Sequence, residues 1–517
     1  MNSIRRFSFI LKASVFATGL SGIVAEYVLS TLATYLLGNA VFQWTITMSL
    51  MLFAMGLGSR ISKNFRWHLL DLFIAVEFLL SILCASASVL AYGLAAHTEN
   101  IGLVIYALAM AIGLLIGFEI PLVTRINQDY EELRTNIANV MEKDYYGALV
   151  GGLLFAFVAL PYLGLTYTPI ALGTINFAVA SIFLWSFRHL LYRSRIAIGA
   201  FFVVTAFLIG LMLAAKPIIL YGEQARYKDK IVYEEQTVYQ KLIITQWRNH
   251  YWLYINGQEQ FSTYDEERYH EPLVHPAMQL ATSHQRILVL GGGDGLAVRE
   301  LLKYKDIGTI TLVDLDPAMP RLARTHPVLL AANGNSMADP RVNVVHEDAG
   351  TYLRNSSELF DVIIIDLPDP DSVDLMHLYS LDFYQMLRHH LSADGVVVTQ
   401  AGSPYFATLA FLCIDRTMRA AGLATLAYHN QVPTMGEWGW ILAMRAGTHG
   451  TTGMRERLQH VRIEGIPTRY LTGEALQAMF TFGKGVFDHP KAGDVEVNTR
   501  HKPVLYRYYK EARWDVY

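Results

Sequence analysis

Charged residues and cysteine are both scarce in this sequence. Lys, Arg, Asp and Glu make up 17% of the 517 residues, whereas about a quarter is usual for a soluble domain. A single soluble globule is therefore excluded. The two cysteines, Cys84 and Cys413, form neither a disulfide framework nor a pair with metal-ligand spacing, so we expect no metal site.

The shortage of charge is confined to the first part of the chain. Residues 1–215 contain 22 charged side chains, whereas the remaining 302 residues contain 65. We therefore expect a multi-pass transmembrane domain at 1–215, in contact with the lipid bilayer, followed by a soluble part. Acidic residues slightly outnumber basic ones in the soluble part. Since no basic face dominates there, we expect no nucleic-acid partner.

Seven apolar stretches in the first part reach the length of about 20 residues that a bilayer crossing requires. Lys and Arg are restricted to alternate connections, beginning with Arg5, Arg6 and Lys12. The positive-inside rule then puts the N-terminus in the cytoplasm of a cell (inner) membrane. The predicted spans of this α-helical bundle are 14–37, 41–59, 69–95, 101–124, 145–165, 168–187 and 196–215.

An odd number of spans has a consequence for the soluble part. Seven spans that start inside deliver it to the outer side of the membrane. However, Lys216, Arg226, Lys228 and Lys230 follow the last span, and basic residues favour the cytoplasmic side. A re-entrant stretch would remove the conflict, and the side is left open.

Three predicted spans each contain a carboxylic acid: Glu26, Glu77 and Glu119. Acids at membrane depth are costly and usually face the interior of a helix bundle or a wet cavity. One interpretation is a cation path, for example for a polyamine. The other, which is the more common arrangement, is a protonated or hydrogen-bonded contact between helices.

The soluble part begins with strand-like segments. Residues 220–262 alternate between apolar and polar, with turns predicted at Asn249-His250 and Asn256-Gly257, which indicates a small antiparallel sheet. Short apolar runs separated by helical patterns then predict an α/β, Rossmann-like domain with a mostly parallel sheet. The predicted strands are 286–290, 309–313, 342–346, 361–365 and 395–399, with a further antiparallel strand at 439–444.

Polar residues stand at the carboxyl ends of these strands, where such sheets bind their ligands. Gly291–Gly295 follow the first strand and Asp314 the second. Later strands are followed by Glu347 and Asp348, by Asp366 and Asp369, and by Gln400. The series indicates a nucleoside-bearing ligand. Asp294 within the glycine loop would repel a pyrophosphate, which favours a sulfonium cofactor of the S-adenosylmethionine type over NAD.

The segments RILVLGGGDGLAVREL, TLVDLDP, HEDAGTYL and FDVIIIDLPDP resemble those of the spermidine synthases, or polyamine aminopropyltransferases. LYINGQEQFSTYDEERYHEPLVHP upstream and LYSLDFYQMLRHHLSADGVVVTQ downstream are also similar, so the resemblance covers roughly 230–445. With its membrane part, the chain resembles the multi-pass bacterial branch of that family. Leu296 in place of a common glycine and a divergent acceptor-side segment at 431–440 are departures.

The resemblance implies roles for matching residues of this chain. Asp366 corresponds to the catalytic acid–base residue and Asp369 to the residue that holds the acceptor diamine. Asp294 would bind the aminopropyl ammonium of decarboxylated S-adenosylmethionine, and Asp314 its ribose. The other residues on the co-substrate side are Gln240, Gly291, Gly293, Asp348 and Ala349, the last two beside the adenine; those on the acceptor side are Gln260, Tyr269, His270, Tyr379 and Asp294.

The expected reaction is aminopropyl transfer from decarboxylated S-adenosylmethionine to putrescine, giving spermidine and methylthioadenosine. The resemblance implies no permanently bound cofactor and no metal, and it suggests a homodimer. Alternatives are an S-adenosylmethionine-dependent methyltransferase and a non-catalytic membrane sensor or transporter of polyamines. Because the co-substrate is made in the cytosol, a cytosolic catalytic domain is favoured.

The soluble part is expected to have three sections: a small sheet region at 220–280, the Rossmann-like core at 281–450 and a C-terminal extension at 451–517. The basic and aromatic tail from Arg500 to Tyr517 is expected to be a packing or solvated segment. Trp438 and Trp440 fit a core position or a substrate wall equally well.

Overall fold

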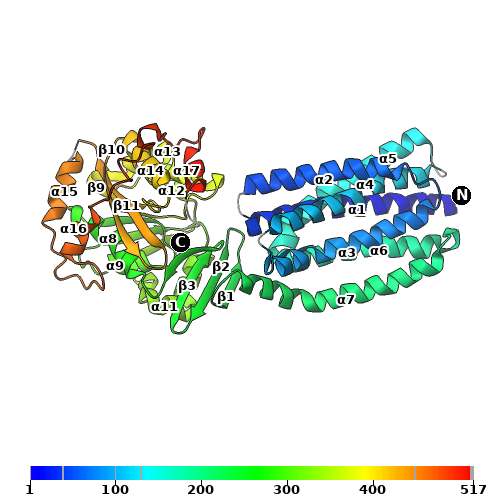
Figure 1. Cartoon of the computed structure of the whole chain (residues 1–517), viewed down its shortest axis with the longest axis horizontal. Coiled ribbons are helices and arrows are strands. Elements are labelled where there is room, and N and C mark those ends of the chain that lie inside the picture. Colours follow the sequence, from blue (N-terminus) through cyan, green and yellow to red (C-terminus); the bar gives the residue numbers. More distant parts are fainter. Residues whose placement is uncertain (1, 38–39, 99, 129–130, 448–449, 513–517) are drawn as a thin grey trace. The chain divides into compact units, whose positions relative to one another are not determined.

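The computed structural model describes residues 2–37, 40–98, 100–128, 131–447 and 450–512. The chain divides into two compact units, Met1–Lys230 and Ile231–Tyr517. The first unit consists of long helices that lie side by side, and the second is an α/β unit (Figure 1). The structure therefore confirms the predicted α/β class of the soluble part.

Long helices rich in apolar residues make up the first unit, and their backbone hydrogen bonds are satisfied within each helix. Among the described residues, six helices are long and apolar enough to cross a membrane, against the seven predicted spans. The elements are α1 (Asn2–Leu37), α2 (Ala40–Ser62), α3 (Leu69–Ala95), α4 (Ile101–Asn127), α5 (Leu133–Leu154), the π-helix η1 (Phe155–Leu163), α6 (Gly164–Phe187), the 3₁₀-helix η2 (Arg188–Leu190) and α7 (Ser194–Ala225).

The numbers of observed and predicted spans differ because one helical run of 58 residues, Leu133–Leu190, is counted as a single span. Both the fifth and the sixth predicted spans fall within it. Contacts with α1 show that α5 runs parallel to α1 whereas α6 runs antiparallel, so the run reverses its direction near Gly164, whose φ is 60°. These contacts are Gly147 with Phe16, Gly151 with Leu20, Asn176 with Ser21 and Phe187 with Phe7.

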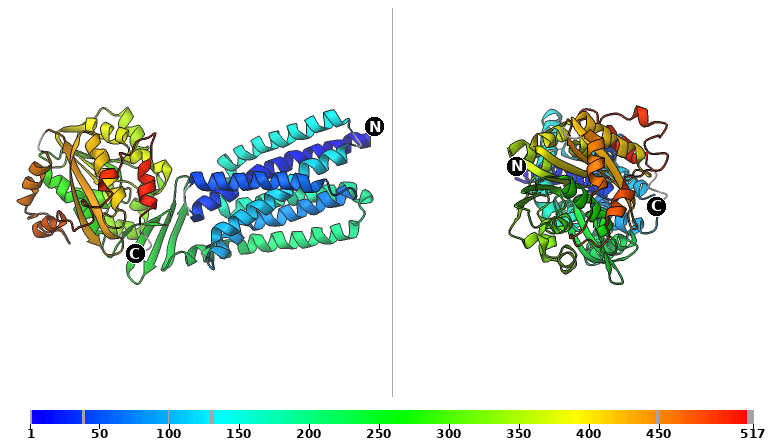
Figure 2. Two further views of the ribbon diagram at one scale, coloured as in Figure 1. Left: turned by 45° about the horizontal axis from the view of Figure 1, so that its top comes forward. Right: turned by 90° about the vertical axis from the view of Figure 1, so that its left-hand side faces the viewer.

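Helix α1 begins at one end of this unit, and helix α7 ends at the opposite end. At one end, Lys12 of α1 forms an ion pair of 3.0 Å with Glu131, near the start of α5. At the other end, the hydroxyl of Tyr35 near the end of α1 donates a 3.0 Å hydrogen bond to Glu223 of α7. The chain therefore leaves the unit at the end opposite to Lys12 (Figure 2).

A four-stranded sheet opens the second unit. The order of its strands follows the chain: β1 (Lys230–Gln236), β2 (Lys241–Trp247), β3 (His250–Ile255) and β4 (Gln258–Ser262). The first turn lies at Arg248 and Asn249, one residue earlier than predicted, because Trp247 pairs with His250. The second turn consists of Asn256 and Gly257, both with positive φ, as a type I′ hairpin turn requires.

The main sheet has seven strands in the order β10-β11-β9-β8-β5-β6-β7. Strands β5 to β9 are parallel, and β10 and β11 form an antiparallel hairpin at one edge. Strand β10 was not predicted. The bounds are β5 (Arg286–Gly291), β6 (Thr309–Val313), β7 (Val342–Val345), β8 (Phe360–Asp366), β9 (Leu391–Gln400), β10 (Leu423–Val432) and β11 (Gly436–Arg445).

Alternate residues of the central strands pack on opposite faces of the sheet. Leu288 and Ile363 belong to the core on one face, whereas Val289 and Ile364 belong to the core on the other. Full burial of such a side chain stabilises the fold by about 1.5–3 kcal/mol. Packing on both faces therefore fixes the positions of the loops at the strand ends.

Helices cover both faces of this sheet. The α-helices are α8 (Glu267–Leu280), α9 (Leu296–Leu301), α10 (Ala318–Thr325), α11 (Pro327–Asn333), α12 (Ala349–Asn355), α13 (Leu381–His390), α14 (Thr408–Ala420), α15 (Gly450–Gln459), α16 (Gly473–Met479) and α17 (Val504–Lys510). The 3₁₀-helices are η3 (Ser336–Ala338), η4 (Val373–Tyr379) and η5 (Ala492–Asp494).

Candidate active site

A cavity of about 230 Å³ lies at the carboxyl ends of the parallel strands. Loops after β5, β6, β7 and β8 form its floor, while β4 and α8 contribute one wall. Every predicted site residue except Tyr379 lines it: Gln240, Gln260, Tyr269, His270, Gly291, Gly293, Asp294, Asp314, Asp348, Ala349, Asp366 and Asp369.

The glycine loop after β5 is pressed against two carboxylate-bearing segments. A Cβ atom at Gly291 would lie 2.1 Å from the carbonyl oxygen of Asp366, and one at Gly293 would lie 2.3 Å from Oδ2 of Asp314. Gly291 also has a φ of 78°, a conformation that L-residues with side chains avoid. The loop therefore has to consist of glycine at these two positions for the carboxylates to reach the cavity.

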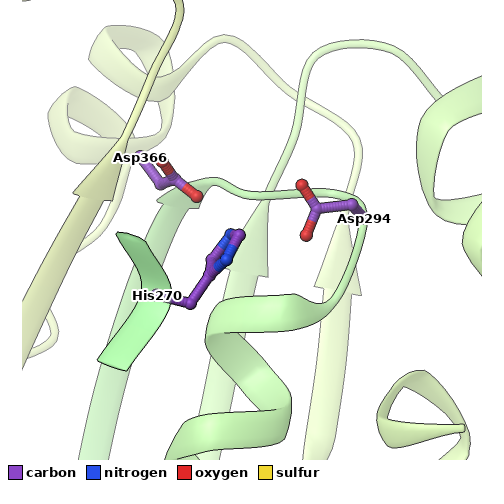
Figure 3. A group of neighbouring side chains, drawn as sticks. All are labelled: His270, Asp294 and Asp366. Atoms are coloured by element: carbon purple, nitrogen blue, oxygen red, sulfur yellow. The ribbon is translucent and has the colours of Figure 1, made fainter. Parts of the chain in front are cut away.

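Three titratable side chains converge at the centre of the cavity. Atoms of His270, Asp294 and Asp366 all lie within 4.8 Å of one another. Figure 3 shows the imidazole ring of His270 pointing toward the space between the two carboxylates. The hydroxyl of Tyr269 donates a 2.8 Å hydrogen bond to Oδ1 of Asp366, which leaves Oδ2 of Asp366 for another donor.

The charges of this group follow from burial and from its neighbours. Burial raises the pKa of Asp366 to about 6, although the positive charge of His270 opposes the shift. Burial lowers the pKa of His270, but hydrogen bonding to Glu266 and the charges of Asp294 and Asp366 outweigh it and raise this pKa to about 9. At neutral pH, Asp366 is therefore largely ionised and His270 is an imidazolium.

The group has donor types that metal ions also use. Nδ1 of His270 is 3.0 Å from the carbonyl oxygen of Glu266, so one of the two ring nitrogens is already engaged. The two carboxylates beside this imidazole attract a cation.

At the β6 end, Asp314 faces the glycine loop. Its Oδ1 accepts a 3.0 Å hydrogen bond from the backbone N–H of Asp316, and burial raises its pKa to about 7. Asp348 caps the N-terminus of α12 by accepting from the backbone N–H of Thr351. A hydrogen bond from His377 is the main cause that lowers the pKa of Asp348 to about 2.

Asp369 lies at the other end of the cavity, three residues after Asp366. Its Oδ1 accepts a 3.1 Å hydrogen bond from the side chain of Gln400, and its Oδ2 accepts a 2.7 Å hydrogen bond from the hydroxyl of Tyr509. Burial raises the pKa of Asp369 to about 6. The two carboxylates therefore lie in different surroundings although both belong to one loop.

Tyr379 lies behind that loop. Its hydroxyl donates a 2.8 Å hydrogen bond to the carbonyl oxygen of Pro368 and accepts a 2.9 Å hydrogen bond from the side chain of Gln400. It is fully buried. Tyr379 therefore supports the loop between the two aspartates rather than lining the cavity.

Sequence reasoning missed two contributions to the end of the cavity at Asp369. The tail from Arg500, predicted to be a packing or solvated segment, places Tyr509 of α17 against Asp369. Its many tyrosines were the sequence feature that could have indicated a role in the cavity. Gln258 in β4 donates a 2.7 Å hydrogen bond to Asp371, and both line the cavity. Trp438 also lines it, whereas Trp440 is completely buried.

Comparisons with known proteins find relatives that match nearly the whole chain. Residues 266–452 match the spermine/spermidine synthase domain. Polyamine aminopropyltransferase 2 of Aquifex aeolicus is 42% identical over 503 residues, which cover 97% of this chain and 98% of that protein. Polyamine aminopropyltransferase 1 of Ralstonia nicotianae is 39% identical over 518 residues, covering 98% and 96% respectively.

A crystal structure of a spermidine synthase in complex with the transition state analogue AdoDATO is 26% identical, covers 50% of this chain and 87% of its own, and has a TM-score of 0.45. The two curated relatives are similar over almost their full lengths, the part that matches the helical unit included. The chain therefore belongs to the polyamine aminopropyltransferase (spermidine synthase) family of polyamine-biosynthetic transferases.

Proposed function

We propose that the chain transfers the aminopropyl group of decarboxylated S-adenosylmethionine to putrescine, giving spermidine and methylthioadenosine. The observation that supports the proposal is the pair of half-buried carboxylates, Asp366 and Asp369, which line one cavity together with Asp294. One carboxylate is needed where the acceptor nitrogen reacts and another where its distal ammonium is held.

Asp366 is the proposed general base. A primary ammonium has a pKa near 10.4, so removing its proton at neutral pH costs about 3 units, or roughly 4 kcal/mol. Since Tyr269 occupies Oδ1 of Asp366, Oδ2 accepts the proton. The free lone pair then attacks the carbon bound to the sulfonium, the C–S bond breaks, and its electrons stay on sulfur as a neutral thioether.

The co-substrate is held by the strand ends. Asp294 binds its aminopropyl ammonium, and Asp314 binds the ribose hydroxyls close to Gly291 and Gly293. Asp348 and Ala349 border the adenine, and Gln240 closes this side of the cavity. The carboxylate of undecarboxylated S-adenosylmethionine would be repelled by Asp294, which gives selectivity by charge.

Putrescine is the proposed acceptor because its two ammonium groups match the two aspartates. Asp369 holds the distal ammonium, with Gln260 and Tyr269 beside the methylene chain and His270 between the acidic groups. Tyr379 fixes the loop that carries both aspartates. Holding both ends of the diamine fixes the approach of the attacking nitrogen.

A product assay tests the proposal. The full chain in detergent receives decarboxylated S-adenosylmethionine with diamines of increasing length, alongside the matched variants Asp366→Asn and Asp369→Asn. Release of methylthioadenosine with putrescine, lost in Asp366→Asn, is the expected result. Transfer of a methyl group would support a methyltransferase instead, and binding without product would support the sensor or transporter.

We propose further that the first unit spans a cell membrane with its basic end in the cytoplasm, and that the run Leu133–Leu190 crosses twice. The reversal near Gly164 supports the second point. In this topology the chain leaves the helical bundle on the outer side of the membrane. The cytosolic supply of the co-substrate and the basic residues after 215 favour instead a catalytic unit in the cytosol.

A fusion of alkaline phosphatase after Tyr517 tests on which side the catalytic unit lies. Because this enzyme is active only outside the cytosol, an active fusion excludes a cytosolic catalytic unit.

We also propose that the second unit has three sections: a small sheet region at 220–280, a catalytic core at 281–450 and an extension at 451–517. Family resemblance supports a homodimer, which the mass of the detergent-solubilised chain in solution would test.

A further inference from the structure

Asp371 is a third aspartate in the loop that follows β8. It lines the cavity together with Asp366 and Asp369, and the resemblance to the family assigns it no role. Its backbone N–H donates a 2.7 Å hydrogen bond to the carbonyl oxygen of Asp369, so the chain turns tightly between the two residues. Asp371 therefore belongs to the end of the cavity where the distal ammonium of the acceptor is proposed to bind.

Strand β4 fixes the direction of the Asp371 side chain. The side-chain amide of Gln258 donates a 2.7 Å hydrogen bond to Oδ2 of Asp371, although the two residues lie 113 positions apart in the chain. Gln258 also lines the cavity. Among the described residues, no side chain donates to the other oxygen, Oδ1. One oxygen of Asp371 is therefore held by the protein, and the other is available to a ligand.

The charges of Asp369 and Asp371 act on each other. Burial raises the pKa of Asp369 to about 6, and the charge of Asp371 contributes to this shift. Burial also raises the pKa of Asp371, although the charge of Lys510 opposes the shift. A charge on one carboxylate makes ionisation of the other less favourable. The two carboxylates are therefore close enough for one ligand to interact with both.

In the described part of the chain, the protein places no cation in contact with this pair. No Lys or Arg lines the cavity, and neither aspartate forms an ion pair with a basic side chain. The side chains that donate to Asp369 and Asp371 are uncharged: the amides of Gln400 and Gln258 and the hydroxyl of Tyr509. Neutral donors orient a carboxylate but do not cancel its charge, so a cation has to come from the ligand.

A primary ammonium has three N–H donors, so it can donate to both carboxylates at once. We propose that Asp371 is a binding residue for the distal ammonium of the acceptor amine and shares that ammonium with Asp369. The inference rests on the proposed function, because it takes the aminopropyl acceptor as the ligand of this end of the cavity. It adds the residue by which the enzyme selects acceptors with a second positive charge.

This arrangement disfavours monoamines as acceptors. A monoamine that places its methyl end beside Asp369 and Asp371 would leave two neighbouring carboxylates partly removed from water without a cation, which is costly. A diamine of the same length puts an ammonium between them, where the attraction to both is favourable. Selectivity for diamines over monoamines should therefore depend on the charge of Asp371.

Two acceptors of equal chain length test the proposal: putrescine and n-butylamine, which lacks the distal ammonium. Release of methylthioadenosine by the full chain in detergent gives kcat/KM for each amine. The variant Asp371→Asn removes the charge but keeps a side-chain oxygen that can accept from Gln258. We expect the ratio of kcat/KM for putrescine to that for n-butylamine to fall about tenfold or more, mainly through the KM for putrescine, because a hydrogen bond to a charged group is lost. If n-butylamine reacts too slowly, its inhibition constant against putrescine replaces its kcat/KM.

The matched control is Asp374→Asn. Asp374 follows in η4, is exposed and does not line the cavity, so this variant should keep the wild-type ratio. An unchanged ratio in Asp371→Asn, or an equal loss for both amines, would overturn the inference while leaving the transfer reaction in place. Absence of methylthioadenosine from the unmodified chain with every amine would overturn the proposed function and this inference with it. If Asp371→Asn does not fold, Asp371→Ser replaces it and is judged by the same ratio.

Discussion

The hydroxyl of Tyr509 donates a 2.7 Å hydrogen bond to Oδ2 of Asp369, although the two residues lie 140 positions apart in the chain. Gln400 donates to the other oxygen, so the orientation of this carboxylate is fixed from two sides. A segment outside the sheet thereby shapes the end of the cavity where the diamine is proposed to bind.

Tyr509→Phe should weaken the acceptor interaction selectively. A hydrogen bond to a charged group contributes about 1.5–3 kcal/mol, so kcat/KM for the diamine should fall about tenfold or more, mainly through KM. The KM for the co-substrate should not change. Tyr506→Phe in the same helix, which does not line the cavity, is the matched control; an equal loss there would indicate damage to α17 instead.

The pH dependence should report on Asp366. A general base works in its ionised form, so activity should rise with pH through about 6, the pKa of Asp366. The hydrogen bond from Tyr269 lowers that pKa, and Tyr269→Phe should therefore move the acidic limb to higher pH. Profiles of kcat/KM for both enzymes, measured with one diamine, check this. A limb that stays in place would assign it to Asp369, whose pKa is also about 6, and not to Asp366.

Glu266 should matter for stability more than for chemistry. Hydrogen bonds to His270 and Arg299 outweigh burial and lower its pKa to about 2. An acid with a lowered folded-state pKa stabilises the fold above its unfolded pKa near 4.3, and this contribution is lost as pH falls toward 2.

Glu266→Gln should therefore destabilise the second unit by about 1.5–3 kcal/mol at pH 7, because His270 and Arg299 lose hydrogen bonds to a charged group, although Arg299 keeps its ion pair with Glu300. Thermal unfolding of the full chain in detergent measures the loss. Glu464→Gln is the control, since Glu464 forms an exposed pair with Arg462, which contributes about 0–1 kcal/mol. Equal effects of both substitutions would contradict the prediction.

Gly293→Ala should obstruct the co-substrate side. The added Cβ would lie 2.3 Å from Oδ2 of Asp314, and overpacking of this kind costs about 1–3 kcal/mol. We expect weaker binding of decarboxylated S-adenosylmethionine by calorimetry, about tenfold. Gly493→Ala, where no atom lies within 4 Å of the new Cβ, should bind normally. Unchanged binding in Gly293→Ala would remove the loop from the co-substrate site.

Features that depend on residues close together in the chain could be predicted from the sequence, whereas contacts between distant residues could not. The strand ends carrying Asp314 and Asp366 were recognisable because each polar residue directly follows an apolar run. Strand β10 was missed although the turn at Gly422 precedes it, because LATLAYHNQV (423–432) has neither an unbroken apolar run nor a strict alternation of apolar and polar residues. Tyr509 could not be placed, since only packing across 140 residues brings it to Asp369.

The helical unit shows the same limit. Its apolar runs predicted helices near their observed positions, because length and composition suffice for that. Which residues of neighbouring helices meet is a property of packing, so the relation of Glu77 to Glu119 became visible only in the structure. The count of spans differed because η1 joins α5 and α6 into one helical run.

The strand order also has a consequence for the time course of folding. Strand β5 lies between β6 and β8, and β8 begins at Phe360, long after β5 has ended at Gly291. The glycine loop meets Asp366 only after that distant pairing has formed, and non-local pairings of this kind slow folding to milliseconds or longer. Binding of the co-substrate should therefore appear late in refolding, after most helical structure has already returned.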